Sequence, residues 1–136
     1  IGLAIAAGNG LVAPVVRDVG GKTLEQIAAA GRDLIARAKD NKLTADDLAG
    51  GCITISNLGG MGIDSFIPIV VPGQCSILGV GRIISTPMPS GKGDILIRKI
   101  MNLNLSVDHR IVNGADAAQF LDYVKKQLEH PDELAN

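Results

Sequence analysis

The segment from Asp94 to Glu129 constrains the fold most. It contains a polar cluster, Asp108 to Arg110, and the spacing of the apolar residues before this cluster differs from the spacing after it. Before the cluster, apolar and polar residues alternate as they do on a pleated strand, with Met101, Leu103, Leu105 and Val107 on one face and Asn102, Asn104 and Ser106 on the other. After the cluster, apolar residues recur at helical spacing: Ala117, Ala118, Phe120, Leu121, Val124 and Leu128. The pattern predicts a strand over 94–107, a helix over 115–129 and a sharp junction between them.

His109 lies at this junction, in Val107-Asp108-His109-Arg110-Ile111-Val112-Asn113-Gly114. Imidazole loses its proton near neutral pH, and the end of a strand would fix the direction of the ring. We therefore predict that His109 is a general base. The alternative is a hydrogen-bonded structural histidine, which is the commoner role of a lone histidine.

The remaining elements are predicted from local signals. A capping-box pattern at Thr23 and Gln26 precedes a helix over 24–39, and a second pattern at Thr44 and Asp47 precedes a single turn over 45–48. Apolar runs over 1–7 and 11–16 flank Gly8-Asn9-Gly10, which is typical of an antiparallel hairpin. Further extended segments are predicted at 52–56, 66–71 and 76–84, with a surface loop at 85–93.

Strands outnumber helices in this reading, and the closing strands are joined by short loops rather than by helical crossovers. These features predict an α+β fold, with a mixed, largely antiparallel sheet covered by helices. The chain of 136 residues is expected to be a single domain, or part of one, over 1–136. Because Ile1 begins in the middle of a predicted strand with no turn before it, we expect the chain to be part of a longer domain.

The composition argues against several functional classes. A net charge of −1 and 2% aromatic residues do not suit nucleic acid, which needs a basic surface or stacking platforms. No apolar run approaches the ~18 residues of a membrane span, and we expect no leader peptide. The surplus of aliphatic residues suggests that part of the surface is buried against copies of the same chain. Cys52 and Cys75 are interpreted as reduced core residues of a cytosol-like compartment, with a disulfide between them as the disfavoured alternative.

Ser56 ends a predicted strand and opens a glycine-rich loop, where a hydroxyl could face a reacting group. The loop lacks the Gly-Lys-Ser/Thr ending of a phosphate loop. A serine hydrolase built from Ser56, His109 and Asp108 fails, since adjacent side chains of an extended segment diverge and no Gly-x-Ser-x-Gly elbow is present. No residues have the spacing of a metal site, and His130 lies in a polar tail, so no metal is expected.

Two stretches together, Ile55-Ser56-Asn57-Leu58-Gly59-Gly60 and Ser106 to Gly114, resemble the signature sequences of the dihydrolipoyl acyltransferases, the core components of the 2-oxo acid dehydrogenase complexes. Supporting similarity lies in Gly10 to Val15, in Arg17-Asp18, in Leu43 to Gly51, in Ile77-Leu78-Gly79 and in Phe120 to Leu134. The resemblance implies a fold like that of chloramphenicol acetyltransferase. It also implies that 1–136 is the C-terminal portion of a catalytic domain whose N-terminal part, with its coenzyme-binding residues, is missing.

The resemblance also implies roles for individual residues. His109 matches the general base that takes the proton of a thiol, and Ser56 matches the hydroxyl that hydrogen-bonds the tetrahedral oxyanion, without a covalent acyl-enzyme. Asp108 and Arg110 match a structural ion pair around His109, with two solvated charges as the alternative, and Gly114 completes the motif. Asn57, Leu58 and Gly59 match the substrate loop.

Asn113 departs from the family pattern, which usually has Asp at this position near the catalytic histidine. A carboxylate there would favour the imidazolium formed during proton transfer. Asn keeps the hydrogen-bonding capacity without the charge, so retuned or reduced activity is expected. A turn-forming role before Gly114 is the alternative.

The substrates implied by the resemblance are coenzyme A or acetyl-coenzyme A and a lipoyl group carried on a separate domain. The loop Ser56 to Gly60 together with Phe66 resembles the pyruvate branch of the family, which favours acetyl as the acyl group. The implied partners are two further chains in a trimer with active sites between subunits, a cubic or dodecahedral core, and the decarboxylase and dihydrolipoyl dehydrogenase components. The implied location is the bacterial cytoplasm, or the mitochondrial matrix or plastid of a eukaryote. Two alternatives stay open: a non-catalytic scaffold subunit, which only Asn113 supports, and a free-standing acetyltransferase acting on a small molecule.

Overall fold

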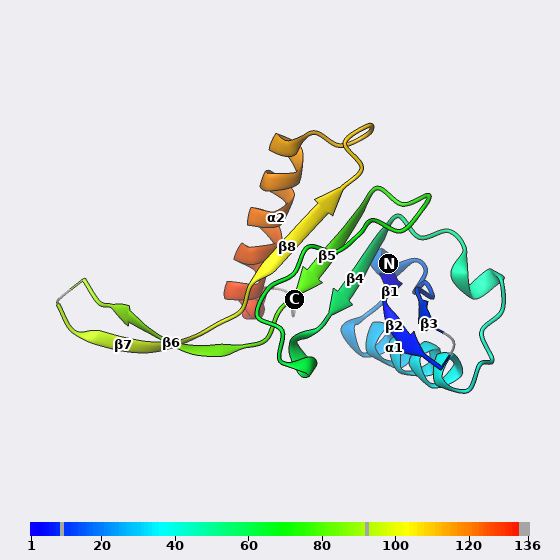
Figure 1. Ribbon diagram of the computed structural model, residues 1–136, viewed down its shortest axis with the longest axis horizontal. Helices are drawn as coiled ribbons and strands as arrows, with labels where there is room; N and C mark the ends of the chain where they lie inside the picture. The colour runs from blue at the N-terminus through cyan, green and yellow to red at the C-terminus, as the bar shows by residue number, and fades with distance from the viewer. Residues whose placement is uncertain (9, 92, 134–136) are drawn as a thin grey trace.

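A mixed four-stranded sheet lies at the centre of the computed structural model, which describes residues 1–8, 10–91 and 93–133 (Figure 1). The strands follow the order β1-β4-β5-β8, with bounds Gly2–Leu3, Ile53–Asn57, Ser76–Val80 and Leu103–Val107. β4 is parallel to both β1 and β5, and β8 is antiparallel to β5. The predicted α+β fold and mixed sheet are confirmed.

The prediction of a largely antiparallel arrangement is wrong for this central sheet. Two of its three pairings are parallel, because β4 returns to β5 through the long connection over 58–75, and such a connection lets two strands run in the same direction. Antiparallel pairing is concentrated in two hairpins, which join β2 (Ile5–Ala7) to β3 (Gly10–Val12) and β6 (Ile84–Pro89) to β7 (Ile95–Ile100). The Asn9 turn predicted for the first hairpin lies outside the described residues.

The core is built around β5 and its neighbour β4. Ile77 and Leu78 are buried on β5, and Thr54 of β4 is fully buried. The Thr54 hydroxyl donates a hydrogen bond of 2.6 Å to Oε1 of Gln74, so this buried polar side chain is satisfied.

The α1 helix (Leu24–Lys39) has the predicted bounds, and its capping box is present. Thr23 Oγ1 accepts from the Gln26 backbone, and the Gln26 side chain accepts from the Thr23 N–H. Leu34 and Ala38 are buried on the inner face of α1, which contacts β2. The predicted single turn is a short 3-10 helix over Asp46–Leu48. Three further 3-10 turns cover Val19–Gly21, Gly59–Met61 and Pro131–Glu133.

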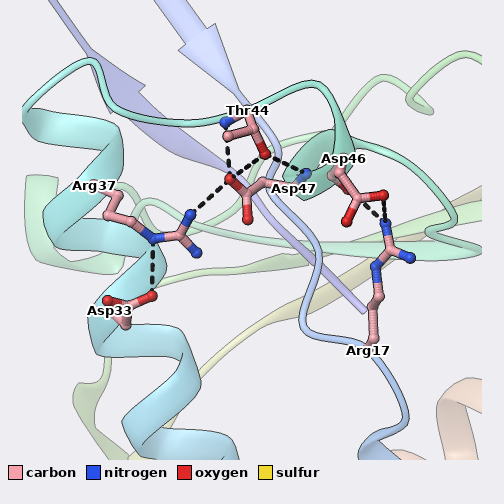
Figure 2. A network of polar contacts seen from close by, with 6 residues as sticks. All are labelled: Arg17, Asp33, Arg37, Thr44, Asp46 and Asp47. Carbon is pink, nitrogen blue, oxygen red and sulfur yellow. Dashed lines mark hydrogen bonds and ion pairs between the residues drawn. The ribbon is translucent and has the colours of Figure 1, made fainter.

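A network of ion pairs ties α1 to the turn over 46–48 (Figure 2). Arg37 donates to Oδ2 of Asp47 at 2.7 Å and to Oδ2 of Asp33 at 2.9 Å. Thr44 donates to the same Asp47 oxygen through its N–H and its hydroxyl, both at 2.8 Å. Hydrogen bonding from Arg37, then from Thr44, lowers the pKa of Asp47 from its ordinary 3.8 to about 2. Arg17 reaches the same turn through Asp46 at 3.0 Å.

The predicted strand over 94–107 is two strands, because Met101 and Asn102 interrupt it between β7 and β8. Asn102 turns aside to accept from the Gly81 N–H at 2.9 Å and to donate from Nδ2 to the Asp64 carbonyl at 3.1 Å. Similarly, the predicted strand over 76–84 ends at Val80, and the predicted strand over 66–71 is irregular chain.

The predicted surface loop over 85–93 is wrong as far as Pro89, since this segment forms β6, which pairs with β7 in a hairpin arm that projects from the body (Figure 1). Both outer edges of a two-stranded ribbon are free, so Pro87 and Pro89 are tolerated there although they lack an N–H group. Lys92 of the predicted loop lies outside the described residues.

The α2 helix (Gly114–Glu129) begins one residue before the prediction and packs beside β8 (Figure 1). Over the described part of the chain, no helix has the length and apolar character needed to cross a bilayer. Both cysteines are free, as predicted, but their assignment to the core is wrong: Cys52 is exposed and Cys75 is half-buried, because both lie just before the buried parts of β4 and β5.

Candidate active site

Ser56 lies near the carboxyl end of β4, half-buried, and is in register with Gly79 of β5. The chain turns away directly after it. Asn57 Oδ1 accepts the Gly59 N–H at 2.9 Å, and the Leu58 N–H donates to the Val80 carbonyl at 3.1 Å. A side chain at Gly59 would come within 2.7 Å of the Gly81 carbonyl oxygen, so only glycine permits this close approach. The predicted substrate loop is therefore a tight turn held against the segment after β5.

The segment that continues this loop is fastened to the rest of the sheet by polar side chains that sequence reasoning did not assign to the site. Asn104 donates from Nδ2 to Ser65 Oγ at 3.0 Å, and Asp64 forms an ion pair with Arg82. Asn104 is level with Ser56 across the sheet, because both are in register with Gly79. The alternation of polar and apolar residues around Asn102 and Asn104 predicted this polar face of the strand. No sequence pattern predicted their hydrogen-bond partners, Asp64 and Ser65.

Phe66 lies against the Cα of Gly79, where an added Cβ would come within 3.1 Å of its ring. Because Gly79 is the register partner of Ser56, the ring is beside the serine on the sheet. Because Gly79 has no side chain, the Phe66 ring can pack directly against its backbone.

His109 follows β8 in a turn, at the junction that the sequence predicted. The Asp108 carbonyl accepts the N–H groups of Ile111 and Val112, both at 3.0 Å, and this closes the turn around the histidine. The imidazole is exposed and makes no hydrogen bond with the described residues. A buried, hydrogen-bonded structural histidine is therefore not what the structure shows.

The Asp108–Arg110 ion pair is present and brackets His109. Arg110 donates from Nε at 2.9 Å and from Nη2 at 2.6 Å to the two carboxylate oxygens of Asp108. Hydrogen bonds from Arg110 lower the pKa of Asp108 from 3.8 to about 2. The Asp108 N–H donates to the Cys75 carbonyl at 2.9 Å, which attaches the turn to the start of β5.

Asn113 occupies the N-cap position of α2, but its side chain makes no capping hydrogen bond. Only its backbone carbonyl acts in the helix, accepting from Ala117 at 3.0 Å. The exposed carboxamide is thus available to another group. Gly114, the next residue, has open space where a side chain would lie, so no contact among the described residues requires glycine there.

The register places Ser56 and His109 at opposite ends of the sheet. Ser56 is level with Asn104, whereas His109 follows Val107, which is level with Ser76 at the start of β5. Along the strands, Asn104 and Val107 are about 10 Å apart, and β4 and β8 are about 10 Å apart across the sheet. The two side chains therefore cannot meet within one chain.

The same geometry excludes a serine hydrolase triad within one chain, and Asp108 is in any case paired with Arg110. Among the described residues, no cluster of three or more histidine, cysteine or acidic side chains could hold a metal ion. His109 instead borders a hollow of about 330 Å³, whose other walls are the segment over 70–74, Val107, Asp108 and Arg110.

All 136 residues match the family model of the 2-oxoacid dehydrogenases acyltransferase catalytic domain. The chain belongs to this acyltransferase family. The site residues therefore lie within a sequence that matches the family over its whole length, as the Ser56 and His109 motifs predicted.

Curated relatives of this family member are acetyltransferases by name. The chain is 44% identical over 132 residues to the dihydrolipoyllysine-residue acetyltransferase component of the pyruvate dehydrogenase complex from Rickettsia felis, covering 96% of this chain and 32% of that protein. It is 41% identical over 128 residues to the component of the same name from Haemophilus influenzae, covering 94% of this chain and 22% of that protein. The chain thus spans about a third or less of these relatives.

Solved structures of the family share the fold. The cubic core of a pyruvate dehydrogenase multienzyme complex superposes with a TM-score of 0.92 at 38% identity, over 99% of this chain and 55% of that chain. Azotobacter vinelandii dihydrolipoamide acetyltransferase, studied for the role of a serine, a histidine and an asparagine in its catalytic mechanism, superposes with a TM-score of 0.87 at 38% identity, over 99% of this chain and 53% of that chain. The acyltransferase fold is therefore present here, in a chain about half as long as those structures.

Proposed function

We propose that this chain carries the catalytic groups of a dihydrolipoyllysine-residue acetyltransferase, which moves an acetyl group between a dihydrolipoyl-lysine arm and coenzyme A. The observation that carries the proposal is the presence of Ser56 and His109 at opposite ends of the sheet, with Ser56 half-buried and His109 exposed. The names of the relatives support acetyl as the acyl group and pyruvate dehydrogenase as the complex.

In this proposal His109 acts as general base. Coenzyme A and dihydrolipoamide present thiols that are mostly protonated at neutral pH, and only the thiolate attacks a thioester well. A neutral imidazole takes the thiol proton as the sulfur bonds to the acyl carbon. When the tetrahedral intermediate collapses, the imidazolium returns that proton to the departing sulfur, so no acyl-enzyme forms.

Ser56 stabilises the tetrahedral intermediate. Negative charge develops on the former carbonyl oxygen, and a hydroxyl that donates to it there contributes about 2.7–4 kcal/mol to the transition state. The glycine loop after Ser56 holds the direction of this hydroxyl through the Asn57–Gly59 hydrogen bond and the close approach of Gly59 to Gly81.

Asn113 assists His109 as a hydrogen-bonding neighbour without a charge. The histidine and asparagine studied in the Azotobacter vinelandii enzyme are four positions apart, as are His109 and Asn113. This agreement supports a catalytic asparagine and weakens the interpretation of Asn113 as a sign of lost activity. The Asp108–Arg110 pair and Gly114 shape the turn.

The active site forms between subunits in this proposal, since Ser56 and His109 of one chain are too far apart to act on one thioester. Three chains in a ring would pair each Ser56 with the His109 of a neighbour. The likeness to a cubic core of a multienzyme complex supports a trimer inside a larger core, either cubic or dodecahedral. The decarboxylase and dihydrolipoyl dehydrogenase components are the proposed partners, in a bacterial cytoplasm, a mitochondrial matrix or a plastid.

The substrates in this proposal are coenzyme A and a lipoyl group on a separate domain, with no metal. The chain covers 53–55% of the solved acyltransferase chains, which supports our view that it is the C-terminal portion of a catalytic domain. Residues that bind coenzyme A are expected in the remaining portion.

Acyl transfer between acetyl-coenzyme A and dihydrolipoamide tests the proposal with the assembled protein. We expect His109→Ala to lower the rate by about 10²–10⁴-fold, because no other described group can take the thiol proton at that place. Ser56→Ala should lower kcat by about 10²–10³-fold. Ser106→Ala, on β8 near the histidine, is a matched control that should leave the rate unchanged.

A scaffold subunit would show no transfer in the unmodified protein. Full activity of the His109→Ala variant would refute the general base. Transfer to small-molecule amines or alcohols in place of dihydrolipoamide would favour a free-standing acetyltransferase.

A further inference from the structure

The only two cysteines of the chain meet at the start of the central strands. Cys52 precedes β4 and Cys75 precedes β5, and the parallel pairing of Ile53 with Ser76 places them side by side. The Cys75 N–H donates to the Cys52 carbonyl at 2.9 Å, and the Cys75 thiol donates to the same oxygen at 3.0 Å. Two residues 23 positions apart are thus in direct contact.

Their backbones are close enough for a disulfide. Neighbouring strands lie about 4.8 Å apart, and a disulfide joins Cα atoms that are about 4.4–6.8 Å apart. Side chains of register partners in a parallel pair point to the same face of the sheet. The Cys75 sulfur lies 3.0 Å from the Cys52 carbonyl oxygen, so the bridge would close by rotation of the two thiols toward each other.

The surroundings of the two cysteines make one of them accessible to solvent and connect the other to the turn that carries His109. Cys52 is exposed, so a reagent in solution can reach it, while Cys75 is half-buried. The Cys75 carbonyl accepts the Asp108 N–H at 2.9 Å, immediately before His109. A change at Cys75 is therefore one hydrogen bond away from the turn that carries His109.

We propose that Cys52 and Cys75 form a reversible dithiol–disulfide pair whose closure alters the His109 turn. The oxidant is a low-molecular-weight disulfide. The Cys52 thiolate attacks one of its sulfurs and releases one small thiol, which leaves a mixed disulfide on Cys52. The Cys75 thiolate then attacks the Cys52 sulfur and releases the second small thiol. The two cysteines lose two electrons and two protons, and the small disulfide gains them.

Closure removes the thiol hydrogen bond from Cys75 to the Cys52 carbonyl and turns the Cys75 side chain toward the Cys52 sulfur. This rotation shifts the Cys75 backbone, including the carbonyl that accepts the Asp108 N–H, and weakens that hydrogen bond. A dithiol, including dihydrolipoamide, reverses the reaction by the same exchange steps. The pair does not depend on the proposed acyltransferase activity and can be tested without it.

The test exposes the purified, assembled protein to glutathione disulfide, followed by alkylation, peptide mapping and mass spectrometry. We expect the peptides that carry Cys52 and Cys75 to be joined, with a loss of about 2 Da and no alkylated thiol on either. Cys52→Ser and Cys75→Ser should each retain a single glutathione adduct on the remaining cysteine. Two glutathione adducts, or two free thiols, in the unmodified sequence would refute the pair.

Hydrogen–deuterium exchange tests the coupling. In the oxidised protein, peptides that cover 107–113 should exchange faster than in the reduced protein, and a dithiol should restore slow exchange. Peptides from α1 should not change, and neither should the Cys75→Ser variant after the same treatment. A disulfide that forms without any change over 107–113 would refute the coupling.

Discussion

In the proposed function, the side chain of Asn113 acts on the base His109. Its carboxamide does not cap α2, and it stands four residues after His109 at the far side of the turn. The carboxamide of Asn113 carries no charge. A carboxylate at this position would favour the charged ring.

We predict that Asn113→Asp moves the acid limb of the pH–rate profile for acyl transfer to higher pH. The base must be neutral to accept a proton, and the added charge holds the proton on His109 more tightly, so activity rises later as the pH increases. Gln119→Glu makes the same change of charge further along α2 and should leave the profile in place. An unchanged pH–rate profile in Asn113→Asp would show that the side chain at position 113 does not influence the base.

The residues of the candidate site were largely predictable, because each belongs to a short motif. The Asp108–Arg110 pair joins residues two positions apart, and Ser56 is followed directly by its glycine loop. The groups that hold the loop were not predictable, since Asn104 and Ser65 are 39 positions apart and no local signal connects them.

At the scale of elements, the loop after Ser56 depends on glycines where two segments touch. A Cβ at Gly81 would collide with the Asp64 carbonyl oxygen, whereas a Cβ at Gly60 would meet nothing within 4 Å. Replacing Gly81 by alanine therefore tests the close packing of the two segments, and the same change at Gly60 is a control for the general effect of replacing glycine.

We predict that Gly81→Ala lowers acyl transfer by about 10²-fold, since displacement of the loop by about 1 Å moves the Ser56 hydroxyl off the oxyanion. The melting temperature should also fall. Gly60→Ala should retain both activity and melting temperature. Steady-state kinetics and thermal melts measure these effects, and equal behaviour of the two variants would contradict the packing argument.

The ion pair between Arg37 of α1 and Asp47 should make the stability of the fold depend on pH. Because the folded pKa of Asp47 is about 2 and its ordinary value is 3.8, the charged form is favoured in the folded chain. Its contribution to stability is present above about pH 4 and is lost as the pH falls through 2.

Arg37→Ala should therefore lower the melting temperature by several degrees at pH 7, and the difference from the unmodified protein should shrink between pH 4 and pH 2. Arg32→Ala, on the exposed side of the same helix, is the matched control and should have little effect. Thermal melts across this pH range measure both. A difference that stays constant with pH would show that the Arg37 effect is not ionic.

Elements were predictable where their signals are local. The bounds of α1 follow from its capping box and its apolar face. The long strand over 94–107 was divided by contacts of Asn102 with Gly81 and with Asp64, which lies 38 positions earlier. The hairpin over 84–100 was hidden by prolines that a free ribbon edge tolerates, and the parallel pairing of β4 with β5 depends on a connection whose path the sequence does not show.

At the scale of the whole molecule, the sheet separates the two proposed catalytic side chains, Ser56 and His109. Ser56 is near the carboxyl end of β4, and His109 follows the carboxyl end of β8, which runs in the opposite direction (Figure 1). In the proposed function, one chain would therefore present half of a site at each end of its sheet. A ring of chains would complete every site with one half from each of two neighbours.

Complementation between inactive variants measures this arrangement directly. Ser56→Ala and His109→Ala chains, each nearly inactive alone, are co-expressed in equal amounts so that they assemble together, and acyl transfer is compared with the unmodified protein. We predict recovery to about a quarter of full activity, because that share of sites in random trimers would pair an intact Ser56 with an intact His109. Variants assembled separately and then mixed should stay inactive. Co-assembled variants that form trimers and remain inactive would contradict a site shared between chains.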